Sequence, residues 1–177
     1  IGLTVIEFPT AYAADADDYL AKGLATRDRF AEHAGLSFCL APHAPYTVND
    51  DTFTRIATIA EALDVPLHLP LHATEDEIRQ SLEKYGVRPF DRMLALGLVS
   101  PRLIAVHAVH LNEREIGLLA QHGASVAHCP ASNLKLASGF APVAAMLKAG
   151  VNVAIGTDGA ASNNRLDVLA EMRLAAM

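Results

Sequence analysis

The stretch Val126-Ala127-His128-Cys129-Pro130 joins a short apolar run to a histidine, and two other stretches of the chain share this form. Ile104-Ala105-Val106-His107 ends in a second histidine, and Val153-Ala154-Ile155-Gly156-Thr157-Asp158 ends in an aspartate. In a parallel β/α barrel the functional side chains gather at the C-terminal ends of the strands. We therefore expect an α/β fold of the barrel type with these three polar side chains on one catalytic rim.

Composition restricts the chain to a few classes of protein. Its 177 residues are 51% hydrophobic, which is enough for a sizeable core in a single domain over residues 1–177 and too high for a disordered chain. The net charge of −6 argues against a nucleic-acid partner, and no apolar run reaches the ~20 residues that span a membrane. The two cysteines, Cys39 and Cys129, make no disulfide framework, so we expect a cytoplasmic protein.

Apolar runs alternate with helical patterns along the whole chain. The runs are apolar on both faces, which is typical of parallel strands covered by helices. Strands are predicted near residues 3–8, 36–41, 65–71, 102–107, 124–128 and 151–156. Helices are predicted over residues 15–33, 50–63, 75–85, 89–96, 112–121 and 141–148. Asn49 and Asn112 are the expected N-caps of two helices, and left-handed residues are expected between a helix and the next strand at Gly35, Gly123 and Gly150.

This order gives about six β/α units of a TIM (β/α)8-type barrel, whereas a closed barrel of this class needs eight. Six strands alone would leave two unpaired edges, so a homo-oligomer formed through the open barrel edges is one expectation. The chain begins with Ile1 rather than methionine and shows no signal peptide, so it could also begin inside a longer protein. The alternatives are a partial barrel whose N-terminal units are absent, an open sheet, or a sheet completed by another chain.

Three side chains, His107, His128 and Asp158, together make a candidate metal site. Each alone is more often structural, because a buried histidine is usually hydrogen-bonded and an aspartate before glycine usually belongs to a turn. Histidine and carboxylate ligands from different strands can hold zinc with an open position for water, and the metal lowers the pKa of that water to about 7. Strand alternation separates Cys129 from His128, so we expect Cys129 to pack in the core and His128 to face the site.

Four segments together resemble the amidohydrolase superfamily, and within it the 5-methylthioadenosine/S-adenosylhomocysteine deaminases. They are Ala41-Pro42-His43-Ala44-Pro45-Tyr46-Thr47, Ile104-Ala105-Val106-His107, the run from His128-Cys129-Pro130 to Ser138-Gly139, and the run from Gly156-Thr157-Asp158-Gly159 to Asn163-Asn164. The similarity spans nearly the whole chain and corresponds to the third through eighth strands of that family's barrel.

The resemblance implies a role for several residues. His107 matches a metal-binding histidine on the sixth strand, and Asp158 matches the eighth-strand aspartate, a metal ligand and proton shuttle. His128 matches the seventh-strand histidine that polarises the substrate or steadies the hydroxide, and His43 matches a fourth-strand histidine near the substrate. The implied cofactor is one divalent metal, with zinc expected and iron or manganese as alternatives, and the implied substrate is a small purine nucleoside. The polar residues after His128 are expected to shape a loop rather than to touch substrate: Ser132, Asn133, Lys135 and Ser138.

The sequence departs from the family pattern in two places. The family carries a His-x-His pair of metal ligands on its first strand, and no such strand is present here. In the fifth-strand motif, a gapless match puts Pro70 at a metal-ligand histidine and Ala73 at the catalytic glutamate. Alternate residues share one side of a strand, so His68 or His72 could reach the metal instead, and Glu75 would restore a His-x-x-Glu spacing.

Three functions are compatible with these residues. The first is a metal-dependent deaminase that hydrolyses a C–N bond of an adenine nucleoside. The second is a catalytically inactive fragment or degenerate homologue without a complete metal site. The third is a part of a longer active enzyme whose upstream strands supply the missing pair. Bound metal distinguishes the first function from the second, and the coding sequence before Ile1 distinguishes the second from the third.

Overall fold

The computed structural model describes residues 1–177, and its framework is one sheet of six parallel strands. The strands are β1 (Gly2–Val5), β2 (Cys39–Pro42), β3 (Leu67–Leu71), β4 (Leu103–His107), β5 (Ser125–His128) and β6 (Asn152–Ile155). They lie in the sheet in chain order, and every neighbouring pair is parallel. All six strands predicted from the apolar runs are confirmed.

Eight helices connect or follow the strands. They are α1 (Ala16–Arg29), α2 (Asp50–Leu63), α3 (Glu75–Tyr85), α4 (Pro89–Ala95), α5 (Glu113–Gln121), α6 (Pro130–Lys135), α7 (Val143–Lys148) and α8 (Val168–Ala175). Asn49 and Asn112 cap α2 and α5 as predicted, since each side chain accepts a backbone N–H. Gly123 and Gly150 are left-handed as predicted, but Gly35 is not, because α1 ends well before it. None of the helices combines the length and apolarity that crossing a membrane requires.

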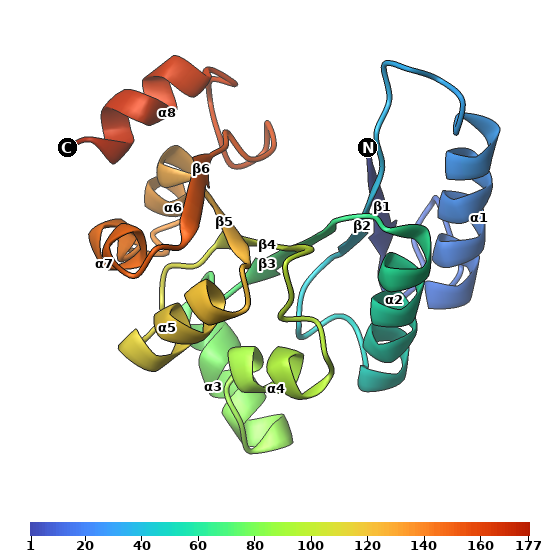
Figure 1. Cartoon of the computed structure of the whole chain (residues 1–177), viewed down its shortest axis with the longest axis horizontal. Helices are drawn as coiled ribbons and strands as arrows, with labels where there is room; N and C mark the ends of the chain where they lie inside the picture. The colour runs from blue at the N-terminus through green and yellow to red at the C-terminus, as the bar shows by residue number, and fades with distance from the viewer.

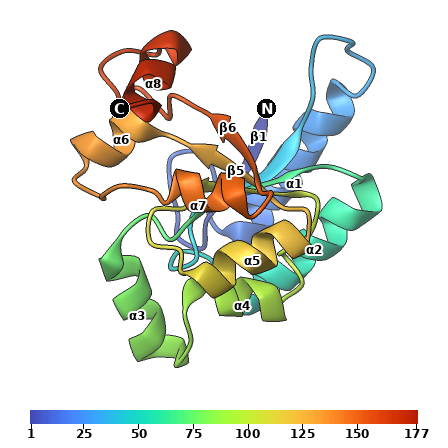
Figure 2. The ribbon, with the colours of Figure 1, turned by 60° about the vertical axis from the view of Figure 1, so that its left-hand side comes forward.

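The strand order explains the overall shape. Parallel strands in strict chain order, joined by right-handed crossovers, place every connecting helix on the same side of the sheet, as in a β/α barrel. Figure 1 shows the strands forming an arc with helices around its outside, and β1 and β6 stand at the two ends of the arc. Figure 2 shows α6 and α8 next to each other at the β6 end. The chain is therefore a partial barrel of six β/α units with two open edges, as predicted.

Strand alternation gives the sheet a helix-covered outer face and a more exposed inner face. On β3, Leu67, Leu69 and Leu71 are buried beneath the helices, whereas His68 and Pro70 face inward and are only half-buried. The strand register extends this inner face across the sheet through Gly2, Thr4, Cys39, Ala41, His68, Pro70, Ile104, Val106, Ser125, Ala127, Asn152 and Ala154. The hydrophobic core lies on the other side, between the sheet and its helices.

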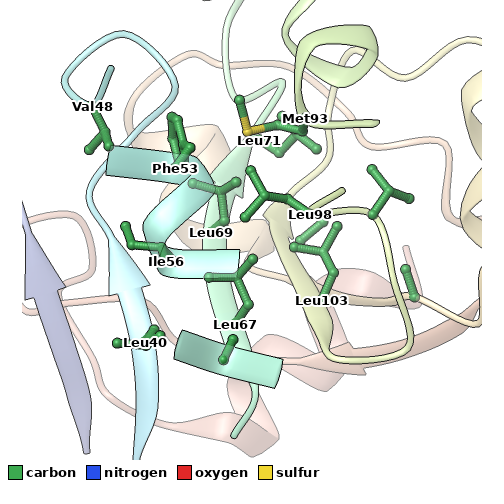
Figure 3. Packing of buried hydrophobic residues seen from close by; sticks show 14 of the residues in the cluster. Leu40, Val48, Phe53, Ile56, Leu67, Leu69, Leu71, Met93, Leu98 and Leu103 are labelled. Atoms are coloured by element: carbon green, nitrogen blue, oxygen red, sulfur yellow. The ribbon is translucent and has the colours of Figure 1, made fainter. Parts of the chain in front are cut away.

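Most of the largest buried side chains lie where β3 and β4 meet α2 and α4 (Figure 3). Phe53 and Ile56 of α2 are fully buried next to the leucines of β3, and Met93 of α4 is fully buried beside them. Full burial of a side chain of this size stabilises the fold by about 1.5–3 kcal/mol. This packing fixes the central strands whose C-terminal ends carry the polar residues.

Pro70 interrupts the hydrogen-bond ladder between β2 and β3. Leu67 donates its N–H to the carbonyl oxygen of Arg102 on the β4 side. The backbone groups of alternate residues in the strand, including Pro70, therefore point toward β2. Proline has no N–H to donate. The strands β2 and β3 are accordingly paired at one register position, Leu40 with Leu67, whereas β3 and β4 are paired at five. A proline in a central strand is rare, and this one lies on the inner face near the end of the strand.

Candidate active site

Polar residues at the C-terminal ends of three strands adopt an unusual backbone conformation. His72 after β3, His107 at the end of β4 and Asp158 after β6 have φ angles of 54°, 70° and 58°. A left-handed backbone is uncommon for residues other than glycine, costs of order 1–3 kcal/mol and clusters at functional sites. This edge of the sheet, where barrels of this type carry their chemistry, is therefore the candidate active site.

The carboxylate of Asp158 is oriented by three hydrogen bonds. Its Oδ2 accepts from the hydroxyls of Ser132 at 2.6 Å and Ser162 at 2.7 Å, and its Oδ1 accepts from the Gly159 N–H at 2.7 Å. Burial alone would raise the pKa of Asp158, but these hydrogen bonds and the nearby His107 lower it below its ordinary value. Asp158 is therefore an ionised and oriented carboxylate, and it is still exposed to solvent.

His107 is held by one buried partner. Its Nδ1 lies 2.9 Å from Oδ1 of Asn133, a residue that is 1% exposed. Asn133 and its neighbour Ser132 were expected only to shape a loop, yet they contact His107 and Asp158. The sequence signal for this role was their position directly after the His-Cys-Pro motif, within the same continuous match.

His68 lies on the inner face, two residues before Pro70 and therefore deeper in the sheet. Burial lowers the pKa of His68, the charge of His107 lowers it further, and the charge of Asp158 raises it. His68, His107 and Asp158 thus influence one another electrostatically. His68 was considered as an alternative metal ligand, but it is the second residue of β3 and lies deeper in the sheet than the strand ends.

The structure corrects the expectation for His128. Strand alternation places His128 on the same side of β5 as Val126, and its register partner on β6 is Ile155. The ring is 7% exposed on the helix-covered face, its Nδ1 has no hydrogen-bond partner, and burial lowers its pKa. Cys129, expected in the core, is buried too, and burial raises the pKa of its thiol to about 12. The buried side of β5 includes its last residue, so His128 does not face the inner side of the sheet.

His43 lies just after β2, at the same edge of the sheet as His107 and Asp158. Its Nδ1 is 3.0 Å from the Thr47 hydroxyl, and its ring meets the ring of Tyr46 edge-on at 6.4 Å between centroids. The imidazole is exposed, and no hydrogen bond joins it to His107 or Asp158. It therefore lies at the same edge of the sheet but apart from the polar cluster, which consists of His107, Asn133, Ser132 and Asp158.

His72 lies outside the cluster, contrary to its tentative assignment as a metal ligand. The side chain is fully buried, its Nε2 accepts the Phe90 N–H at 3.1 Å, and its Nδ1 is 3.3 Å from the carbonyl oxygen of His110. Burial lowers the pKa of this ring to about 4. The strand ends at Leu71, and the left-handed backbone of His72 ends the alternation that would have placed it beside Pro70. Both ring nitrogens are engaged, so His72 supplies no free ligand atom.

The carboxylates near Ala73 do not take the place of the expected glutamate. Glu75 begins α3 and is exposed to solvent. Glu77 is buried, and its two carboxylate oxygens accept the N–H groups of His72 and Ala73, each at 2.9 Å. Burial raises the pKa of Glu77 to about 7, although both hydrogen bonds act to lower it. Glu77 therefore holds the loop between β3 and α3 together.

The residues of this chain do not form a metal site by themselves. No three histidine, cysteine, aspartate or glutamate side chains lie close enough together to hold a metal ion. Catalytic zinc sites use three protein ligands. Here His107 and Asp158 offer two, Pro70 has no ligand atom, and His72 is engaged elsewhere. A metal at this edge would need ligands in addition to these.

Comparison with known proteins finds one family and several relatives that match nearly the whole chain. The model of the amidohydrolase family matches residues 7–177. A 5-methylthioadenosine/S-adenosylhomocysteine deaminase of Teredinibacter turnerae is 47% identical over 173 residues, which cover 98% of this chain and 39% of the relative. The chain thus spans about two fifths of the length of the curated relatives it matches.

Solved structures show the same arrangement of strands and helices. An adenosine deaminase from Xanthomonas campestris with bound zinc matches with a TM-score of 0.96 and 52% identity, over 99% of this chain and 40% of that protein. An atrazine chlorohydrolase from Arthrobacter aurescens complexed with zinc matches with a TM-score of 0.87 and 28% identity, over 97% of this chain and 38% of that protein. The six β/α units described above thus correspond to part of each of these larger folds.

Proposed function

Because this chain belongs to the amidohydrolase family, we propose that it functions within a hydrolytic deaminase that removes the amino group of adenine nucleosides of the 5-methylthioadenosine and S-adenosylhomocysteine type. The observation that carries this proposal is the oriented carboxylate of Asp158 beside His107 at the C-terminal edge of the sheet. A relative named 5'-deoxyadenosine deaminase, 47% identical over 138 residues, supports the same substrate class.

Asp158 would accept the proton that a water molecule loses as it attacks the adenine ring. A carboxylate that is ionised, exposed and held by three donors is ready for this task, and a well-placed general base contributes about 10²–10⁴-fold to rate. His107 presents a ring nitrogen without a hydrogen bond in the chain, and His43 stands at the rim where a substrate would enter. His128, on the helix-covered face, would act only through the packing of β5.

One divalent metal is proposed for the complete site, and zinc is supported by the two zinc-containing neighbours. The present residues do not complete its coordination, so His107 and Asp158 are proposed as part of a ligand set. Residues 1–177 are proposed to form a single catalytic domain, an incomplete barrel, in a cytoplasmic protein. The open edges at β1 and β6 support association through these strands, including a homo-oligomer.

A second candidate function is a nucleoside-binding homologue without activity. Pro70 faces inward near the end of β3 but has no side-chain atom that can bind a metal, and the side chain of Ala73 cannot transfer a proton. Loss of one general acid or base removes about 10²–10⁴-fold in rate, and a missing metal ligand adds to that loss. These two residues are the specific observation in favour of this candidate.

A chimera distinguishes the two candidates. Residues 1–177 would replace the matching segment of the Teredinibacter turnerae relative, and ammonia release from 5-methylthioadenosine would be measured with zinc present. Release by this chimera, lost at least about 100-fold on Asp158→Asn, supports the deaminase. Release only after Pro70→His and Ala73→Glu together supports the inactive homologue. A folded chimera that releases no ammonia even with both substitutions would contradict the proposal.

A further inference from the structure

The short helix α6 contacts two predicted site residues that come from different strands. Ser132 and Asn133, neighbours on α6, are 0% and 1% exposed. Ser132 donates to Asp158 after β6, and Asn133 contacts the ring of His107 at the end of β4. A buried polar group that reaches a functional side chain fixes the orientation of that side chain.

A second buried contact fixes α6 itself. Glu171 of α8 is 1% exposed, and its Oε2 accepts the N–H of Ala131 in the first turn of α6 at 2.9 Å. Its Oε1 accepts from Nδ2 of Asn163 at 2.7 Å, and the same Nδ2 donates to the carbonyl oxygen of Thr157, the residue before Asp158. The backbone of α6 is therefore tied to α8 and to the end of β6, so Asn133 reaches His107 from a fixed position.

The contact between Asn133 and His107 defines the position of the ring proton. The carbonyl oxygen Oδ1 of Asn133 can only accept a hydrogen bond, so Nδ1 of His107, 2.9 Å away, must donate. In the neutral ring only one nitrogen carries hydrogen, so Nε2 then has a free lone pair. Nε2 makes no hydrogen bond in the chain. An amide rotated by 180° would reverse this pattern and place the proton on Nε2.

We propose that Asn133 is a positioning residue that holds His107 in the Nδ1–H tautomer and keeps Nε2 free to accept a proton or bind a metal. The role of His107 in a reaction rests on the proposed function. The tautomer itself is a property of this chain alone, so it can be measured without any deaminase activity.

The test is ¹⁵N NMR of the 177-residue chain with labelled histidine, at about pH 8, above the ordinary histidine pKa of about 6.5. The His107 signals are assigned by their loss in His107→Gln. We expect a protonated Nδ1 and an unprotonated Nε2 in the parent chain. Asn133→Asp, which keeps a carbonyl-type acceptor, should preserve this pattern, whereas Asn133→Leu, of similar size, should abolish the preference.

A matched control is Asn164→Leu, because Asn164 contacts Lys135 on the surface and not His107. It should leave the His107 signals unchanged. A parent chain with the proton on Nε2 would overturn the proposal, as would an Asn133→Leu variant that folds and keeps the Nδ1–H form. If Asn133→Leu fails to fold, Asn133→Ser, which keeps a hydroxyl near the ring, provides the second test and should weaken the preference. An expected NMR result combined with an inactive chimera would contradict the proposed function while leaving the positioning role intact.

Discussion

The imidazole Nε2 of His72, just after β3, accepts the backbone N–H of Phe90 in α4 at 3.1 Å, although the two residues are 18 positions apart in the chain. Phe90 is the second residue of α4, so its N–H is one of the donors that a helix cannot satisfy internally. Since Nε2 accepts, the neutral ring carries its proton on Nδ1, which lies 3.3 Å from the His110 carbonyl oxygen. His72 thus joins β3, α4 and the segment after β4.

Replacing His72 should destabilise the fold without affecting the polar cluster at Asp158. We expect His72→Leu to lower the free energy of unfolding by about 3 kcal/mol, because the Phe90 N–H is left buried without an acceptor and the new side chain fits poorly. Urea-induced unfolding measures this change. His33→Leu, at an exposed histidine, should change the free energy by less than about 0.5 kcal/mol. Equal small effects of both substitutions would contradict a structural role for His72.

Glu77 should make the stability of the chain depend on pH. Its folded-state pKa is raised to about 7 from an ordinary 4.5, so the folded chain keeps its proton after the unfolded chain has lost it. The contribution of Glu77 to stability therefore falls as the pH rises from about 4.5 to 7, by about 3 kcal/mol in all. His72, with its pKa lowered to about 4, acts in the opposite direction between pH 4 and 6.5.

The Glu77 effect is isolated by comparison with Glu77→Gln, which cannot titrate. Unfolding of both chains would be measured at intervals between pH 4 and 8. The parent should lose stability relative to the variant across this window and run parallel to it above pH 7.5. A constant difference at every pH would show that the two backbone N–H donors keep Glu77 ionised in the folded chain.

The strands were predictable because each is a short apolar run bounded by turn residues. Such a run is the sequence pattern typical of a parallel strand that is covered by helices. Asn49 and Asn112 indicated where two helices begin, because asparagine is a favoured N-cap residue. The two helices that the patterns did not predict, α6 and α8, are both short. Only Cys129 separates α6 from β5, whereas an irregular segment joins β6 to α8. The helix α6 begins with Pro130 and spans six residues, too few for a period of 3.6 to be visible.

The side chains of the site were predicted less well, and the reason lies in the backbone. Alternation along a strand predicts the facing of His68 and Pro70 correctly, but it stops at the left-handed residue His72. The side of the sheet that His128 faces depends on which alternate residues of β5 are buried. The sequence of a four-residue strand does not determine this. Asn133 was identified only as part of a loop, because its role depends on a contact with a residue in another unit.

Phe53 should contribute far more to stability than any exposed aromatic residue. It is fully buried between α2 and β3, so Phe53→Ala removes apolar contacts and leaves a cavity (Figure 3). We expect the free energy of unfolding to fall by about 3–5 kcal/mol. Phe140, which is 85% exposed, is the matched control, and Phe140→Ala should change the value by less than about 0.5 kcal/mol. Comparable losses from both variants would place the core elsewhere than between the sheet and its outer helices.

Pro70 should be the residue that limits metal binding by this chain. It faces inward one residue before the register position of His107, so Pro70→His would add an imidazole on the inner face close to His107 and Asp158. We expect the parent chain to lose zinc on dialysis against a mild chelator, and Pro70→His to bind zinc at least about tenfold more tightly, which corresponds to about 1.4 kcal/mol. Adding Asp158→Asn to Pro70→His should remove the gain. Thr4→His places a histidine on the inner face at the β1 end of the sheet, and it should bind no better than the parent. Equal zinc affinity in the Pro70→His and Thr4→His chains would mean that His107 and Asp158 do not form part of a ligand set.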